Sequence, residues 1–109
     1  MKIRINTDNH IEGHEELAEQ AEATVKITLG HLADHITRVE VHLSDGNSGK
    51  GGAHAKRSMM EARLEHHEPI SVTEDAEMIA QALDGAAGKL QRLLDHTLAR
   101  LSARQGRNP

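Results

Sequence analysis

In this 109-residue chain, apolar residues recur in some segments at every second position, as in strands, and in others at every third or fourth position, as in helices. Residues 1–7 alternate isoleucine with polar residues, which is the two-residue period of a strand with one buried face. Similar strands are predicted over 36–45 and 56–65, and a short fourth strand begins at Ile70. Between the first two strands, residues 12–32 repeat apolar side chains at steps of three and four, which predicts an amphipathic helix.

The longest periodic segment runs from residue 75 to residue 103 and contains no proline. At 100° per residue, one side of this predicted helix collects apolar side chains within about 40° of a common direction. These residues form its expected core face: Ile79, Leu83, Ala86, Leu90, Leu94 and Leu101. The pattern then fades, so we expect one domain over residues 1–104 and a frayed tail over 105–109.

The segments follow the order strand, helix, three strands, helix. A helix between the first two strands requires a crossover connection and makes these strands parallel, whereas the short links among the last three strands make them antiparallel. Each strand has one apolar side, so both helices are expected on the same face of the sheet. The predicted fold class is α+β, a two-layer β-α-β-β-β-α sandwich with a four-stranded mixed sheet and two helices on one face.

Composition narrows the chemistry that such a domain can perform. Apolar residues make up 37% of the chain, and Phe, Trp, Tyr and Cys are absent, so the core must consist of Leu, Ile, Val, Met and Ala. The lack of cysteine excludes a disulfide framework, a thiolate zinc site and a thiol nucleophile. The lack of aromatic rings excludes the stacking platforms of single-strand binders. Any binding of nucleic acid must therefore depend on charge and shape.

Charge is distributed unevenly along the chain. Thirteen Lys and Arg against seventeen Asp and Glu give a net charge of −4, yet residues 85–109 carry five basic residues and one acidic residue. On the helical wheel of 75–103, Lys89, His96 and Arg100 lie within about 40° of one direction beside the core face, and Arg92 lies slightly further round. Aspartates occupy a different side. A row of cations is often a solvated face, but this segregation favours contact with a polyanion.

The sequence offers little support for catalysis or metal binding. The Gly-Lys step at residues 49–50 lacks the first glycine and the following Ser or Thr that a phosphate-binding loop requires. No nucleophile, base and acid stand in an arrangement that spacing alone can support. We therefore expect no enzyme, no cofactor and no metal. Two histidine pairs have four-residue spacing but no third ligand: His10 with His14, and His31 with His35.

A further signal lies in residues 82–94, Ala-Leu-Asp-Gly-Ala-Ala-Gly-Lys-Leu-Gln-Arg-Leu-Leu. This segment resembles the last helix of the ribosome hibernation-promoting and ribosome-associated inhibitor family, also called the sigma-54 modulation family. The family pattern there is Ala-Ile-Asp…Ala…Asp-Lys-Leu-x-Arg-x-Leu. The order of elements and the strand at 39–44 are also similar, so the resemblance covers residues 1–101. The matching positions are Leu83, Asp84, Ala86, Lys89, Leu90, Arg92 and Leu94.

The resemblance implies a cytoplasmic stress factor that binds the small ribosomal subunit between head and body and blocks the channel of messenger and transfer RNA. In that family, basic residues of two helices contact ribosomal RNA phosphates. The partner would be ribosomal RNA rather than DNA or a membrane, and no apolar run here approaches the roughly 18 residues of a bilayer span. Lys89 and Arg92 match the motif. The other candidate RNA-binding residues are His96, Arg100, Arg104 and, on the first helix, Lys26.

Two alternatives stay open. The first is a protein-interaction module on the same fold, for example a weak homodimer joined through a sheet edge or the sheet face with Met59. The first predicted helix also departs from the family, because it carries several glutamates and only Lys26 as a cation. His96 within the basic row also leaves pH-dependent RNA binding open, because histidine titrates near neutral pH. A surface that is positive across both helices would favour RNA, whereas an acidic first helix beside an exposed apolar patch would favour a protein.

Overall fold

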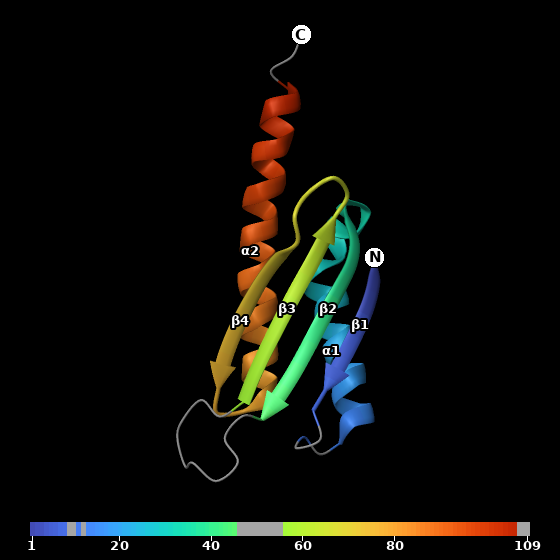
Figure 1. Cartoon of the computed structure of the whole chain (residues 1–109), viewed down its shortest axis with the longest axis vertical. Coiled ribbons are helices and arrows are strands. Elements are labelled where there is room, and N and C mark those ends of the chain that lie inside the picture. Colours follow the sequence, from blue (N-terminus) through green and yellow to red (C-terminus); the bar gives the residue numbers. More distant parts are fainter. Residues whose placement is uncertain (9–10, 12, 46–55, 107–109) are drawn as a thin grey trace.

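Two helices cover one face of a four-stranded sheet in the computed structural model of this chain (Figure 1). The structure describes residues 1–8, 11, 13–45 and 56–106, with side chains as far as residue 103. The α+β class and the two-layer arrangement that the sequence predicts are confirmed. The elements are β1 (Lys2–Thr7), α1 (His14–Leu29), the 3₁₀ helix η1 (Gly30–His35), β2 (Ile36–Asp45), β3 (Lys56–Leu64), β4 (Ile70–Ala76) and α2 (Ile79–Gly106).

The strands follow one another across the sheet in the order β1-β2-β3-β4. β1 pairs with β2 in parallel, and β2 with β3 and β3 with β4 are antiparallel, as the connection lengths predict. Ile3 lies opposite Val39 and Ile5 opposite Val41, so the apolar sides of the two strands coincide. β1 and β4 are the edge strands of the sheet.

The core lies between the sheet and the two helices and contains no aromatic ring. The helices bury a stripe of side chains such as Val25 and Leu90, both with no exposed surface. They meet the helix-facing side chains of the central strands, such as Val41 and Met60. Full burial of a side chain of this size stabilises the fold by about 1.5–3 kcal/mol. The predicted core of Leu, Ile, Val, Met and Ala is therefore confirmed.

The boundary between β4 and α2 differs from the sequence prediction. The helix was expected from residue 75, but β4 continues to Ala76 and α2 begins at Ile79. The reason is pairing with a neighbour, because residues 73–76 extend the antiparallel ladder with β3, in which Arg57 lies opposite Asp75. A strand that gains its partner from a distant segment is not evident from its own sequence.

The first and last residues of both helices also differ from those that the apolar periodicity predicts. α1 begins at His14 rather than residue 12, after Gly13 adopts the left-handed conformation (φ 69°), and the chain tightens into η1 after Leu29. α2 continues to Gly106 and, with 28 residues, is about 42 Å long. Its C-terminal turns therefore extend beyond the sheet (Figure 1). The glycine-rich segment 46–55 and residues 107–109 lie outside the described residues.

Candidate nucleic-acid interface

The outer side of α2 carries three of the candidate RNA-binding side chains in the solvent. Arg92, His96 and Arg100 are all exposed, and none of them has an ion-pair partner among the described residues. One helical period brings His96 and Arg100 onto the same side, with Arg92 further out from the core. Arg104 belongs to the same helix, but its side chain lies outside the described part of the chain. α2 thus presents an open basic side toward its C-terminal half.

Lys89 occupies the same side of α2 but contacts the sheet. Its Nζ donates a hydrogen bond to the backbone oxygen of Thr73 at 2.9 Å and lies 2.5 Å from Oε1 of Glu74. Both partners belong to the edge strand β4. The charge of Lys89 is therefore balanced within the molecule, and its side chain ties α2 to the edge of the sheet. Its role toward RNA stays a prediction.

A glycine makes this contact possible. A Cβ atom at Gly85 would lie 2.7 Å from Cγ and Oε2 of Glu74, closer than real Cβ contacts allow. The glutamate side chain thus rests directly on the backbone of α2, one turn before Lys89. In the segment that matches the family motif, Gly85 and Lys89 together hold Glu74, which is a structural function of those two positions.

The other side of α2 is acidic and faces η1. Oδ1 of Asp95 lies 3.3 Å from Nε2 of His31, which links the two elements across the surface. Because η1 is a 3₁₀ helix with about three residues per turn, His31 and His35 do not share a side as they would in an α-helix. No cluster of three or more potential metal ligands occurs among the residues that the structure describes.

α1 contributes almost no positive charge to the surface. Lys26 is its one Lys or Arg, and its Nζ pairs with Oε1 of Glu22 at 2.9 Å. Ile27 is 82% exposed on the same helix. The positive surface of α2 therefore does not extend across both helices in the described part of the chain. The remaining exposed glutamates of α1 are Glu15, Glu16 and Glu19.

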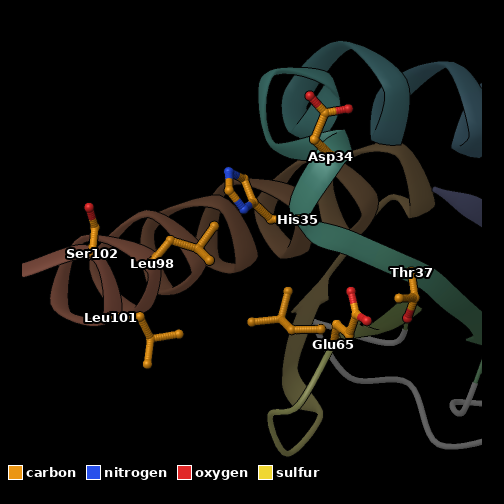
Figure 2. Close-up of a pocket in the computed structure, with 8 residues that line it drawn as sticks. Asp34, His35, Thr37, Glu65, Leu98, Leu101 and Ser102 are labelled. Carbon is orange, nitrogen blue, oxygen red and sulfur yellow. The ribbon is translucent and has the colours of Figure 1, made fainter. Parts of the chain in front are cut away.

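A shallow cleft lies where the C-terminal half of α2 passes the end of the sheet (Figure 2). Its volume is about 370 Å³, and Leu64, Leu98 and Leu101 supply its apolar side chains. Asp34 lines it from η1, and Glu65 lines it from the turn that follows β3. Carboxylates in this position repel phosphates, so the cleft does not extend the basic side of α2.

Sequence reasoning missed two features of the charged surface. Glu74 was placed at the approach to a helix, so it was not recognised as the partner of Lys89. The partner of Arg57 was also not recognised: on the sheet face away from the helices, Arg57 donates two hydrogen bonds to the Asp75 carboxylate at 2.7 and 3.1 Å. These bonds raise the pKa of Arg57 above its usual value. Strand alternation combined with the pairing register is the signal that locates such residues.

The fold and this surface define a small α+β protein with a charged exterior, and no helix of the described chain is long and apolar enough to cross a membrane. The chain belongs to the sigma-54 modulation protein / S30EA ribosomal protein family, whose model matches residues 3–102. No curated protein matches its sequence.

Two solved structures share the fold. The Protein Y N-terminal domain of Thermus thermophilus has a TM-score of 0.71 and 18% identity, and the match covers 89% of this chain and 99% of that domain. A ribosomal subunit interface protein from Coxiella burnetii has a TM-score of 0.69 and 16% identity, with 91% and 99% covered. The similarity to these two structures shows that this chain has the same fold as they do.

Proposed function

We propose that this protein is a cytoplasmic ribosome hibernation factor that binds ribosomal RNA of the small subunit and blocks translation, without catalysing a reaction. The observation that carries the proposal is the family match over residues 3–102, with the exposed basic side of α2 inside the matched range. Lys and Arg bind phosphates by charge alone, which suits a chain without aromatic rings.

The candidate residues differ in whether their side chains are available to bind an RNA phosphate. Arg92, His96 and Arg100 are exposed and can contact RNA phosphates without first breaking an ion pair with a described residue. Lys89 must leave Glu74, and Lys26 must leave Glu22, before either can bind a phosphate. The RNA contact is therefore expected to centre on the C-terminal half of α2, with Arg104 extending it.

The test is sedimentation with purified ribosomes and with separated subunits, at low and at physiological salt. The protein should pellet with the small subunit, and more strongly at low salt. Arg92→Gln with Arg100→Gln should weaken pelleting and lower the salt slope by about 2, one unit for each lost phosphate contact. Lys89 is left unchanged in this variant, since replacing it would also remove the contact with β4.

The matched control is Gln20→Glu with Ala23→Glu, which changes the net charge by the same amount at exposed positions of α1. It should pellet like the parent protein. Absence of pelleting by the parent protein even at low salt would refute the proposed function. An equal loss in both variants would show that overall charge, rather than the basic side of α2, controls binding.

A second candidate function follows from α1. This helix exposes both glutamates and Ile27, and an acidic helix with an exposed apolar side chain fits a cationic protein. In that case α1 would contact a basic protein segment, of the ribosome or elsewhere. Ile27→Lys should then abolish the complex, because it removes the apolar contact and adds a charge that repels a cationic partner. Unchanged binding of every protein partner in this variant would exclude the α1 surface.

A further inference from the structure

The face of the sheet opposite the helices is uncovered in the described part of the molecule (Figure 1). Because side chains alternate along a strand, every second residue points to this face. Its side chains are those of Lys2, Arg4, Asn6, Arg38, Glu40, His42, Ser44, Arg57, Met59, Glu61, Arg63, Ser71, Thr73 and Asp75.

Three cations lie side by side at one end of this face. Lys2 of β1 is opposite Arg38 of β2, and Arg38 is opposite Arg63 of β3. Neighbouring strands are about 4.8 Å apart, so the row spans about 10 Å. Like charges directly opposite one another destabilise a sheet. An anion bound across this row would remove that cost.

Carboxylates in the next row balance only part of the charge. Arg38 lies 3.7 Å from Glu40, and Arg63 lies 3.4 Å from Glu61. Lys2 and Arg4, by contrast, are exposed on the edge strand and have no ion-pair partner among the described residues. The positive charge that is available to a ligand therefore concentrates at the β1 side of the face.

The two layers of the protein differ in sign. The uncovered sheet face holds five cations and three carboxylates, a formal charge of +2. The helix layer, counted over residues 14–35 and 79–103, holds four Lys or Arg and seven Asp or Glu, a formal charge of −3. The sheet face is therefore the more favourable side of the molecule for a polyanion.

The side chains of this face indicate the kind of polyanion. Unpaired bases need aromatic or similar surfaces on which to stack, and the face has none. Double-helical RNA is bound mainly through its shape and its phosphates, for which a broad face with separated Lys and Arg side chains is suited. Arg100 belongs to α2, which lies against the opposite face of the sheet, and Asp34 and Glu65 line the cleft between α2 and the end of the sheet. The two basic surfaces are thus distinct.

We propose that the uncovered sheet face is a second RNA-contacting surface, which binds the phosphate backbone of double-helical RNA through Lys2, Arg4, Arg38 and Arg63. The inference rests on the proposed function only in taking RNA as the partner. It adds a surface on the layer opposite α2, so RNA can approach the protein from both sides.

The test measures binding of an isolated RNA duplex over a range of salt concentrations. Lys2→Gln with Arg4→Gln removes two exposed charges that have no ion-pair partner in the described structure, so folding should be unaffected. Binding should weaken equally for duplexes of different sequence, and the salt slope should fall by about 2. Glu40→Gln with Glu61→Gln should have the opposite effect and tighten binding, because Arg38 and Arg63 are then no longer balanced.

The control is again Gln20→Glu with Ala23→Glu on α1, which should bind the duplex like the parent protein. A salt slope unchanged by Lys2→Gln with Arg4→Gln would overturn the inference, as would an equal fall in the control. Self-association of the Lys2→Gln, Arg4→Gln variant in gel filtration, with duplex binding intact, would also overturn it. The two cations would then serve only to keep the β1 edge from pairing.

The outcomes separate this inference from the proposed function. If Arg92→Gln with Arg100→Gln abolishes ribosome pelleting while the β1 variant binds duplex RNA normally, the inference fails and the proposed function stands. If the parent protein does not pellet with ribosomes, but duplex binding falls in the β1 variant alone, the proposed function fails and the sheet face stands as an RNA-binding surface.

Discussion

The two helices lie side by side on one face of the sheet, and each buries an apolar stripe, yet their outer sides differ in charge. α1 exposes four glutamates over residues 15–22 and carries one lysine, which is paired with Glu22. α2 has no acidic residue in its first turn and exposes Arg92 at its midpoint and Arg100 in its second half. Packing therefore determines the inner side of each helix and leaves the outer side open to other requirements.

Those requirements differ between the two helices. Gly13 precedes α1 without a side-chain hydrogen bond to the first turn, and Glu15 and Glu16 lie in that turn, where the helix dipole favours negative charge. Part of the acidity of α1 thus has a structural reason. The exposed arginines of α2 make no ion pair within the described residues, so the fold supplies no comparable reason for them. Charge without a structural role is the better indicator of a partner.

The largest effect is expected from the buried side of α2. Leu90→Ala should lower the free energy of unfolding by about 2–5 kcal/mol, since Leu90 is fully buried and its loss leaves a cavity. Leu93→Ala on the same helix, where the side chain is 44% exposed, should cost less than about 1 kcal/mol. Urea denaturation measures both. Equal losses would mean that the inner and outer sides of α2 are not as distinct as the structure shows.

A smaller loss is expected at the start of α1. Glu15→Gln with Glu16→Gln should lower the free energy of unfolding by about 1 kcal/mol, because each carboxylate interacts with the helix dipole by about 0.3–1 kcal/mol. Denaturation at low ionic strength shows the effect, and added salt should reduce it. Ribosome pelleting should be unchanged. A marked gain in pelleting would indicate that α1 faces RNA and that its acidity opposes binding.

Local patterning was sufficient for most of the fold. The alternation of Val39, Val41 and Leu43 placed β2 correctly, and the core stripe of α2 was correct at Leu83, Leu90 and Leu94. Such patterns arise because each element buries one side, and that side is visible in its own sequence. The sequence alone therefore predicted the layers and the direction of every strand.

Features that depend on pairing between distant segments were not predictable in the same way. The end of β4 depends on the ladder with β3. Because the helix was expected from residue 75, Glu74 was not recognised as a strand residue and as the partner of Lys89. The row of Lys2, Arg38 and Arg63 likewise becomes visible only with the register of three strands. Whether a charged side chain is available to a ligand depends on such pairings, so the candidate site was less predictable than the fold.

The ion pair between Lys89 and Glu74 allows a test of the basic side of α2, because removing the Glu74 carboxylate leaves the charge of Lys89 unpaired. Glu74→Gln should lower the free energy of unfolding by at most about 1 kcal/mol, since both side chains of the pair are partly exposed. It should also tighten ribosome binding, because Lys89 then adds an unbalanced charge beside Arg92. Glu68→Gln, in the exposed turn before β4, makes the same change in net charge and should not affect binding. Unchanged binding in Glu74→Gln would place Lys89 away from the RNA.

The smallest effect is expected where the two helical segments are joined at the surface. His31 and Asp95 are each about half exposed, so His31→Ala should lower the free energy of unfolding by no more than about 0.5 kcal/mol. His14→Ala, at an exposed position of α1, is the control for loss of a surface imidazole. A loss above about 1 kcal/mol in His31→Ala alone would contradict the weak role assigned to this pair. The contact between η1 and α2 would then depend on this polar link as well as on the core, and Asp95 on the outer surface of α2 would have a structural role.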